Sequence, residues 1–276
     1  MRAALIQLCS GDDPAANLRQ TLPLIEEAAG GGAEFVLTPE VTNCVSSSRT
    51  RQKEVLALEG DDITLAALRD AAAQRGIWLL IGSLALKTGD ADGRFANRSF
   101  LIAPDGTIAA RYDKIHMFDV TISDSESYRE SAGYRPGGGA VLAQTPFAAV
   151  GMTICYDVRF PHLYRNLAQK GAQILTVPSA FSPVTGAAHW HTLLRARAIE
   201  TGAYILAPAQ SGTHEASAGK PRQTYGHSLA VAPWGEVLAD GGKGVGVIYV
   251  DLDMAEVAQA RQRIPALIQD PEFGGP

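Results

Sequence analysis

Short apolar runs alternate with longer amphipathic stretches along most of the chain. The runs AALIQL (3–8), EFVLTPE (34–40) and IWLLIGSLAL (77–86) have the length and the β-branched or aromatic content of buried strands. Between them, 14–29 and 62–75 show helical periodicity, and the first of these stretches begins with an Asp-Pro pair and ends at three glycines. This alternation predicts an α/β chain.

The rest of the chain departs from a strict strand–helix rhythm. Residues 95–114 and 227–240 each predict a hairpin, because a Pro-Asp-Gly or Pro-Trp-Gly turn divides two apolar runs. Further strands are expected at AVGMTIC, AQILTVPSA, YILAPA and VGVIYVDL, further helices at 161–170, 189–202 and 253–263, and a long loop at 116–139. The pattern favours mixed sheets covered by helices over a parallel barrel. Because no linker-like segment interrupts the chain, we expect one domain over 1–276.

Composition and charge narrow the range of partners. The chain has 276 residues and a net charge of −5, and its basic residues form no block. We therefore expect it to bind neither nucleic acid nor a membrane. Its three cysteines, Cys9, Cys44 and Cys155, are far apart and form no CxxC pair. Together with an amino terminus too short in apolar residues for a signal peptide, this pattern predicts a cytoplasmic protein.

The sequence predicts no metal and no cofactor. Gly30 to Gly32 precede a strand, so they are expected to end a helix rather than cradle a phosphate. His189 and His191 are two apart on an expected helix and therefore face different ways. The other four histidines, His116, His162, His214 and His227, show no ligand-like spacing.

The segment ICYDVRFP (154–161) places a thiol directly after an apolar strand. Ligands bind at the carboxyl ends of strands in α/β architectures, so Cys155 is a candidate nucleophile, with a small buried side chain as the alternative. A cysteine nucleophile needs a proton acceptor and a group that stabilises the oxyanion. Glu40 and Lys114 also follow expected strands, although each alone reads equally well as a solvated charge.

Taken together, these three segments resemble the nitrilase superfamily of carbon–nitrogen hydrolases. That family carries a glutamate, a lysine and a cysteine in this order, each at a strand end. The resemblance covers nearly the whole chain, and its segments here are LTPE, RYDKIHMFD, GMTICYDVRFP, VPSAFSPVTGAAHW, LLRARAIET, YGHS and VAPWGEVLA. It implies a four-layer α-β-β-α sandwich.

The resemblance also implies catalytic roles. Glu40 would take the proton of Cys155, whose thiolate would attack an amide carbonyl. Lys114 and the backbone N–H of Tyr156 would stabilise the oxyanion. The substrate would be cleaved to an acid and ammonia through a thioester.

A second glutamate is expected before the cysteine strand. Glu130 in YRESAGYRPG matches the family's position, where it would orient Lys114 and the substrate amide. Glu126, four residues earlier, is the alternative.

Four residues are candidates for substrate binding. Arg159 could hold a substrate carboxylate through its guanidinium, or else form an internal ion pair with Asp157 or another acid. Phe181, Thr185 and Met117 are further candidates, with simple packing as the alternative.

Within the family, the sequence looks most similar to small ω-amide hydrolases. A small carboxylate-bearing amide is the implied substrate, deaminated glutathione in the first place and α-ketoglutaramate as the alternative. A nitrilase, an N-acyltransferase or an inert binding protein are the other classes in play. Family members are homodimers or larger homo-oligomers, and 189–202 is a candidate interface helix. His191, where relatives usually carry an acid, and Pro208 depart from the family's pattern.

Overall fold

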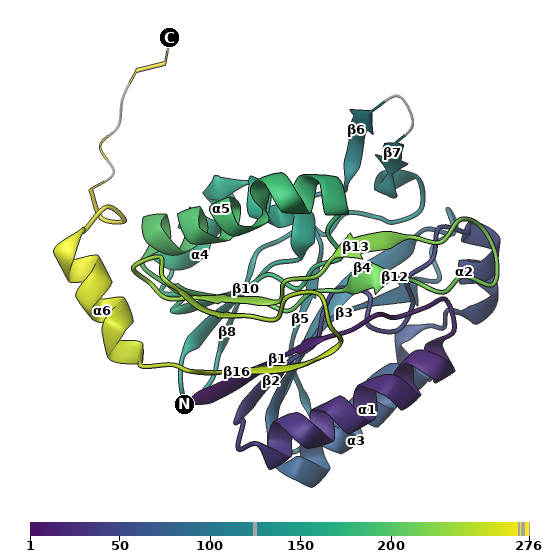
Figure 1. Cartoon of the computed structure of the whole chain (residues 1–276). Helices are drawn as coiled ribbons and strands as arrows, with labels where there is room; N and C mark the ends of the chain where they lie inside the picture. Colours follow the sequence, from purple (N-terminus) through teal and green to yellow (C-terminus); the bar gives the residue numbers. More distant parts are fainter. Residues whose placement is uncertain (124–125, 270, 272–273, 276) are drawn as a thin grey trace.

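Two six-stranded sheets form the centre of the molecule (Figure 1). The computed structural model describes residues 1–276 except 124–125, 270, 272–273 and 276. The first sheet has the order β16-β1-β2-β3-β4-β5 and the second the order β15-β14-β11-β10-β9-β8.

The first sheet combines parallel and antiparallel pairs. Strands β1, β2 and β3 run parallel to one another. On one side of them, β16 pairs antiparallel with β1. On the other side, β4 pairs antiparallel with β3, and β5 pairs antiparallel with β4. The bounds are β1 Arg2–Gln7, β2 Phe35–Leu37, β3 Trp78–Lys87, β4 Phe95–Ile102, β5 Ile108–Asp113 and β16 Gly246–Asp251. The expected turn between β4 and β5 is present, with Gly106 at φ 80°.

The second sheet repeats this plan. Strands β9, β10 and β11 are parallel, and β8, β14 and β15 extend them antiparallel at the two sides. The bounds are β8 Val141–Gln144, β9 Ala149–Met152, β10 Ile174–Thr176, β11 Tyr204–Ala207, β14 Leu229–Val231 and β15 Val237–Asp240.

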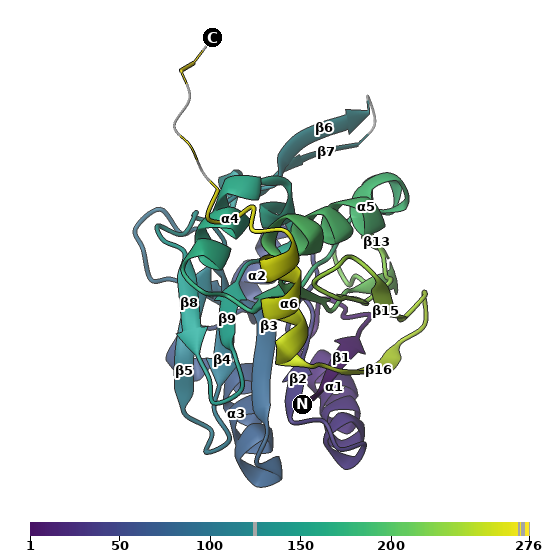
Figure 2. The same cartoon turned by 90° about the vertical axis from the view of Figure 1, so that its left-hand side faces the viewer.

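Helices cover the outer face of each sheet (Figures 1 and 2). Helices α1 (Pro14–Gly30) and α3 (Ile63–Arg75) lie against the first sheet, and α4 (Pro161–Gln169) and α5 (Pro183–Thr201) against the second, while α6 (Met254–Arg263) follows β16. Among the described residues, no helix has both the length and the hydropathy needed to cross a membrane.

The burial pattern explains why the strands read as continuous apolar runs. Along β1, Ala3 and Leu5 point into the core between the sheets, and Ala4 and Ile6 point into the core beneath α1 and α3. A strand buried on both faces needs apolar residues at every position. The predicted four-layer α-β-β-α sandwich is confirmed.

Three local features differ from the expectations. Helix α5 begins at Pro183, six residues before the predicted start at 189, because a proline fits the first turn of a helix. The predicted loop at 116–139 contains a two-stranded ribbon, β6 (Asp119–Ser123) and β7 (Glu126–Arg129). A short helix α2 (Arg49–Val55) and a second ribbon, β12 (Ser211–Thr213) with β13 (Gln223–Tyr225), were not expected.

Candidate active site

The ends of three strands converge on one cavity. Glu40 lies three residues after β2, Lys114 directly after β5, and Cys155 three residues after β9. All three line a cavity of about 740 Å³, together with Glu130. The structure therefore brings together four residues that are spread over more than a hundred positions of the sequence.

Two of these positions lie in unusual backbone. Cys155 has φ 48°, as does Val41 beside Glu40, and only a few per cent of non-glycine residues adopt positive φ. Hydrogen bonds hold both turns, because Cys155 N–H donates to the Pro178 carbonyl at 2.9 Å and Val41 N–H donates to Ser83 Oγ at 2.8 Å. Such conformations cost free energy and persist only where surrounding contacts impose them.

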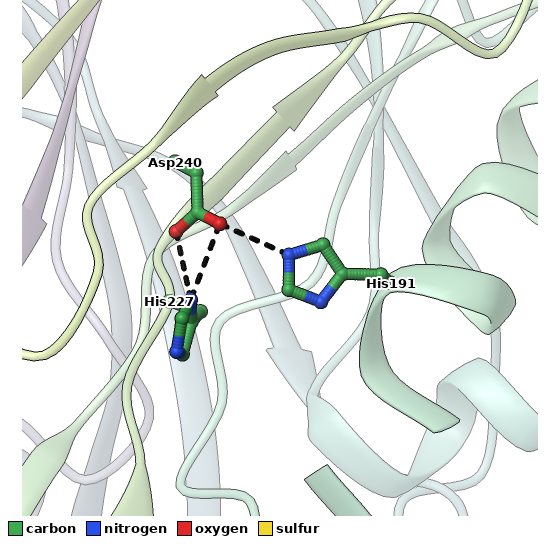
Figure 3. Close-up of side chains that lie close together, drawn as sticks. All are labelled: His191, His227 and Asp240. Atoms are coloured by element: carbon green, nitrogen blue, oxygen red, sulfur yellow. Dashed lines mark hydrogen bonds and ion pairs between the residues drawn. The ribbon is translucent and has the colours of Figure 1, made fainter. Parts of the chain in front are cut away.

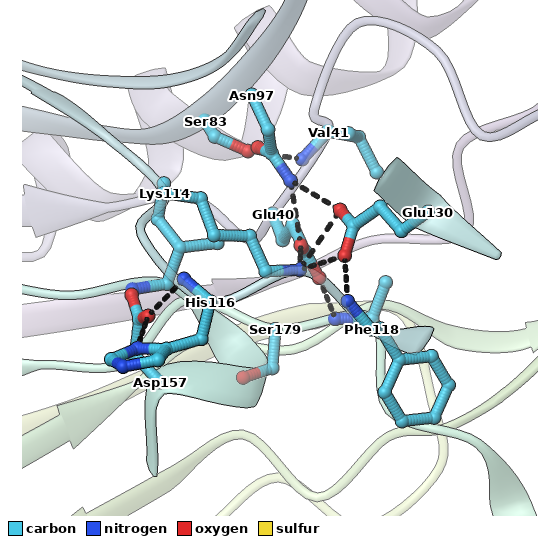
Figure 4. A network of polar contacts seen from close by, with 12 residues as sticks. Glu40, Val41, Ser83, Asn97, Lys114, His116, Phe118, Glu130, Asp157 and Ser179 are labelled. Carbon is cyan, nitrogen blue, oxygen red and sulfur yellow. Dashed lines mark hydrogen bonds and ion pairs between the residues drawn. The ribbon is translucent and has the colours of Figure 1, made fainter. Parts of the chain in front are cut away.

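Lys114 joins the two glutamates of the site (Figure 4). Its Nζ donates to Glu40 Oε1 at 2.9 Å and to both carboxylate oxygens of Glu130, at 3.0 and 2.9 Å. The Lys114 side chain is 2% exposed. An ammonium buried this deeply is tolerated because two carboxylates neutralise it and accept its hydrogen bonds.

The Glu40 carboxylate is fixed on both of its oxygens. Oε1 accepts from Lys114 and from Asn97 Nδ2 at 2.8 Å, and Oε2 accepts from the Ala180 backbone N–H at 2.9 Å. This carboxylate interacts electrostatically with the Cys155 thiol, which lines the same cavity. Glu40 thus lies between the ammonium and the thiol.

Glu130 is held by the backbone of the segment that follows Lys114. Its Oε2 accepts from Phe118 N–H at 2.6 Å, and Asn97 Nδ2 lies 3.4 Å from its Oε1. The alternative candidate, Glu126, begins β7, and its side chain lies outside the described residues.

The electrostatics keep the thiol protonated at rest. Burial and the Glu40 charge raise the pKa of Cys155 above its usual range. Burial also acts to raise the pKa of Glu40, but the Lys114 ammonium outweighs it and the pKa lies below its usual value. Burial acts to lower the pKa of Lys114, and the charges of Glu130 and Glu40 raise it well above its usual value. The resting site is therefore a thiol beside a carboxylate and an ammonium.

Asp157 has a structural place next to the thiol. Its Oδ2 accepts from Tyr112 O–H at 2.6 Å and from Ile154 N–H at 2.8 Å, and its Oδ1 lies against the backbone N–H and Nδ1 of His116. These contacts make His116 a hydrogen-bonded structural residue. They also occupy the Asp157 carboxylate with partners other than Arg159.

The candidate substrate-binding residues divide into two groups. Among the described residues, Phe181 and Thr185 line the cavity, as does Tyr156, whereas Arg159 and Met117 do not. Arg159 lies over the Tyr156 and Phe181 rings, 6.0 and 5.4 Å from their centroids, and 3.3 Å from His189 Nδ1. Met117 packs against an apolar cluster that contains Val41, Cys44, Phe95 and Tyr134. Met117 thus occupies the position expected of a packing residue.

Several residues at the site were not expected from the sequence. Asn97 is the third residue of β4 and bridges Glu40 and Glu130, and the polar run Asn97-Arg98-Ser99 within this strand was the signal for it. The cavity also carries four unpredicted cations from three separate segments: Arg49, Arg129, and the pair Lys220 and Arg222. Their scatter along the sequence gave no cluster to recognise.

The histidines also differ from the sequence expectation. His191 and His227, which show no ligand-like spacing along the chain, meet in space together with Asp240. None of these three side chains is among the described residues that line the Cys155 cavity.

Comparison with known proteins places this geometry in a family. The carbon-nitrogen hydrolase family profile matches residues 2–262. The chain belongs to the carbon-nitrogen hydrolase family. It is therefore an enzyme that hydrolyses carbon–nitrogen bonds other than peptide bonds, as the sequence predicted.

Comparison with individual relatives of this carbon-nitrogen hydrolase supports the same family assignment. It is 40% identical over 266 residues to "deaminated glutathione amidase" of Yersinia enterocolitica, covering 96% of this chain and 91% of the relative. It is 34% identical over 264 residues to "omega-amidase NIT2" of Danio rerio, covering 96% and 92%. The crystal structure of the C. elegans NitFhit protein superimposes with a TM-score of 0.90 at 35% identity, over 98% of this chain and 64% of that one.

Proposed function

We propose that the chain is an amidase in which Cys155 is the nucleophile, Glu40 the general base and acid, and Lys114 an electrostatic stabiliser. The observation that supports it most directly is the position of the Glu40 carboxylate, which accepts from Lys114 Nζ and interacts electrostatically with the Cys155 thiol inside one cavity. A base beside a nucleophile, with a cation on the other side, is the arrangement that covalent catalysis requires.

In the first half-reaction, the Cys155 sulfur attacks the amide carbonyl while the thiol proton moves to Glu40. The carbonyl oxygen gains negative charge, which Lys114 and the Tyr156 N–H stabilise. The tetrahedral adduct then collapses, the carbon–nitrogen bond breaks, and the leaving nitrogen takes the proton from Glu40. A thioester on Cys155 remains.

In the second half-reaction, Glu40 removes a proton from a water molecule as that water attacks the thioester. The carbon–sulfur bond breaks, the carboxylic acid leaves, and Glu40 returns the proton to the sulfur. Glu130 orients Lys114 throughout the cycle by accepting two hydrogen bonds from its Nζ. The cycle balances without a cofactor.

The proposed substrate is a small amide that carries carboxylates, and deaminated glutathione is the preferred candidate. The cations Arg49, Arg129, Lys220 and Arg222 line the cavity and offer partners for such groups. A cavity of about 740 Å³ also suits a tripeptide-sized molecule better than a single short acid. A relative of 40% identity carries that amidase name.

The alternative substrate is α-ketoglutaramate, since a relative of 34% identity is named an omega-amidase. The two substrates release different nitrogen products. Ammonia leaves from α-ketoglutaramate, which is a primary amide, whereas the amine of cysteinylglycine leaves from deaminated glutathione. The sequence-based expectation that ammonia is released therefore applies only to α-ketoglutaramate.

A side-by-side assay tests the proposal. The purified enzyme is given each compound, and 2-oxoglutarate, which both release, is measured with Cys155→Ala as the control. We expect a higher kcat/KM for deaminated glutathione and no turnover in the variant. A preference for α-ketoglutaramate would make the enzyme an omega-amidase, and turnover by Cys155→Ala would contradict the nucleophile.

We further propose that the chain works as one domain, in the cytoplasm, and as a homo-oligomer. The family match over residues 2–262 supports the first point, and three free cysteines are typical of a reducing compartment. Val184 and Ile199 on α5, 58% and 54% exposed, supply apolar surface for a partner copy. Light scattering on the purified protein tests the oligomeric state.

A further inference from the structure

Three side chains meet outside the catalytic cavity (Figure 3). His191 comes from α5, His227 from the segment before β14, and Asp240 from the end of β15. Asp240 Oδ2 lies 3.0 Å from His191 Nε2 and 3.2 Å from His227 Nδ1, and Asp240 Oδ1 lies 3.0 Å from the same His227 Nδ1. The three ligand-type atoms lie within 4.8 Å of one another. Two imidazoles thus share one carboxylate between them.

The surrounding structure fixes these groups. Asp240 Oδ1 accepts from Gly242 N–H at 2.9 Å, which anchors the carboxylate. The His227 carbonyl accepts from Trp190 Nε1 at 2.8 Å, and the His227 ring stacks on Tyr225 at 4.5 Å between centroids. His227 has φ 58°, a conformation that its neighbours must impose. The pair of rings and the carboxylate therefore keep their mutual positions without an ion.

We propose that His191, His227 and Asp240 form a binding site for a divalent transition-metal ion of the Zn²⁺ class. Zinc bonds to histidine nitrogen at about 2.0–2.1 Å and to carboxylate oxygen at about 2.0–2.2 Å, so tetrahedral ligands stand about 3.4 Å apart. The two distances from Asp240 Oδ2 are close to that separation. Small side-chain rotations that widen them admit an ion between the three atoms.

The donor set selects the class of ion. Two imidazoles and one carboxylate favour zinc and similar transition metals over Ca²⁺ and Mg²⁺, which prefer all-oxygen sites. The side chains of His191, His227 and Asp240 are 37%, 21% and 33% exposed, so water has access to a fourth position. On binding, each imidazole presents a lone pair to the ion, and any proton on that nitrogen moves to the other ring nitrogen or to solvent. No oxidation or bond cleavage is involved.

An ion here would connect α5 to the edge of the second sheet. The first turn of α5 contributes Pro183, Val184 and Thr185 to the cavity wall. Metal binding would therefore stabilise the fold and brace one wall of the cavity from outside. This inference does not depend on the substrate or on the catalytic roles proposed above.

Zinc binding by Cys155→Ala protein, in competition with a chromophoric chelator, tests the proposal. The Cys155→Ala background removes the reactive thiol, which could itself bind zinc. Two further variants, His191→Gln and Asp240→Asn, are made in this background. The matched control is His189→Gln, because His189 lies on the same helix and contacts Arg159 instead of Asp240.

We expect one zinc per chain, at least about 10-fold weaker binding in His191→Gln and Asp240→Asn, and unchanged binding in His189→Gln. A hundredfold excess of zinc over Kd should raise the Tm of the parent by about 5 °C or more, and that of His191→Gln by less. Equal zinc affinity in parent and His191→Gln would overturn the proposal. So would a parent that binds no zinc, which would leave the three residues as a hydrogen-bonded contact only.

Discussion

The carboxylate of Asp157 lies 2.7 Å from Nδ1 of His116, two residues beyond Lys114. The same carboxylate accepts from Ile154 N–H, at the residue before Cys155. One fully buried acid therefore connects the segment that carries the ammonium to the turn that carries the thiol. The acid in ICYDVRFP thus fixes the turn that carries Cys155, the proposed nucleophile.

Replacing Asp157 with Asn should lower both stability and turnover. Each carboxylate oxygen faces two groups, Tyr112 O–H and Ile154 N–H on one side and the N–H and Nδ1 of His116 on the other. Because an amide NH₂ group would face donors in either orientation, the free energy of unfolding should fall by about 3 kcal/mol. Urea unfolding measures this, with the exposed Asp70→Asn as control. An unchanged midpoint would contradict the positioning role.

Lys114→Met should abolish most activity and destabilise the fold. The variant keeps the length of the side chain and loses the charge that neutralises Glu40 and Glu130. We expect kcat to fall at least about 10²–10³-fold, as for the loss of an oxyanion donor. The free energy of unfolding should fall by about 3–5 kcal/mol, because two carboxylates remain in the site without the ammonium that neutralises them. Steady-state kinetics and urea unfolding measure the two effects, and Lys170→Met on exposed surface should change neither.

Glu130→Gln should slow the enzyme less than Glu40→Gln. Gln at position 130 can still accept from Lys114 and Phe118, so we expect kcat of Glu130→Gln to fall about 10–10²-fold. In Glu40→Gln the proposed proton acceptor is lost, so we expect kcat to fall about 10²–10⁴-fold or more. A pH profile separates the roles. The acid limb of kcat/KM belongs to Glu40, whose pKa is below its usual value, and it should persist in Glu130→Gln. If Glu130→Gln were the slower variant, the assignment of the two acids would need to be exchanged.

His214 should make the protein less stable in mild acid. It is 1% exposed, Nδ1 donates to the Ser10 carbonyl at 2.7 Å, and Nε2 lies 2.7 Å from Thr224 Oγ1. Burial lowers its pKa from 6.5 to about 4. The unfolded chain therefore binds more protons between these values, and stability present above pH 6.5 is lost as the pH falls towards 4.

The size of this effect is at most about 3 kcal/mol, from roughly 1.4 kcal/mol per pKa unit. Urea unfolding at pH 7 and pH 4.5 measures it in the parent and in His214→Gln. The parent should lose more stability than the variant over this interval. Parallel losses in the two proteins would mean that other groups account for the acid sensitivity.

The sequence predicted the strands and the residues at their ends because both follow from local patterns. Runs buried on two faces must be apolar, so β1, β3 and β9 were recognisable. Glu40, Lys114 and Cys155 were conspicuous because each follows an expected strand, β2, β5 and β9 respectively. Their meeting in one cavity followed from the family resemblance and not from spacing alone.

What the sequence did not reveal depends on contacts between distant segments. Asn97 could be seen as a polar residue in a strand, but its partners Glu40 and Glu130 lie 57 and 33 positions away. The meeting of His191 with Asp240 likewise joins a helix to a strand 49 positions later. Such pairings are set by how the sheets and helices pack, which no local pattern records.

The positive φ angles at Val41 and Cys155 link the stability of the fold to catalysis. Backbone strain of this kind costs about 1–3 kcal/mol per residue. The two turns that place Glu40 and Cys155 in the same cavity are thus among the segments with the least favourable backbone conformation. A substitution that relaxes either turn would make the enzyme harder to unfold and, by letting the two groups drift apart, slower. Selection for heat resistance alone should therefore yield variants with a higher Tm and a lower kcat.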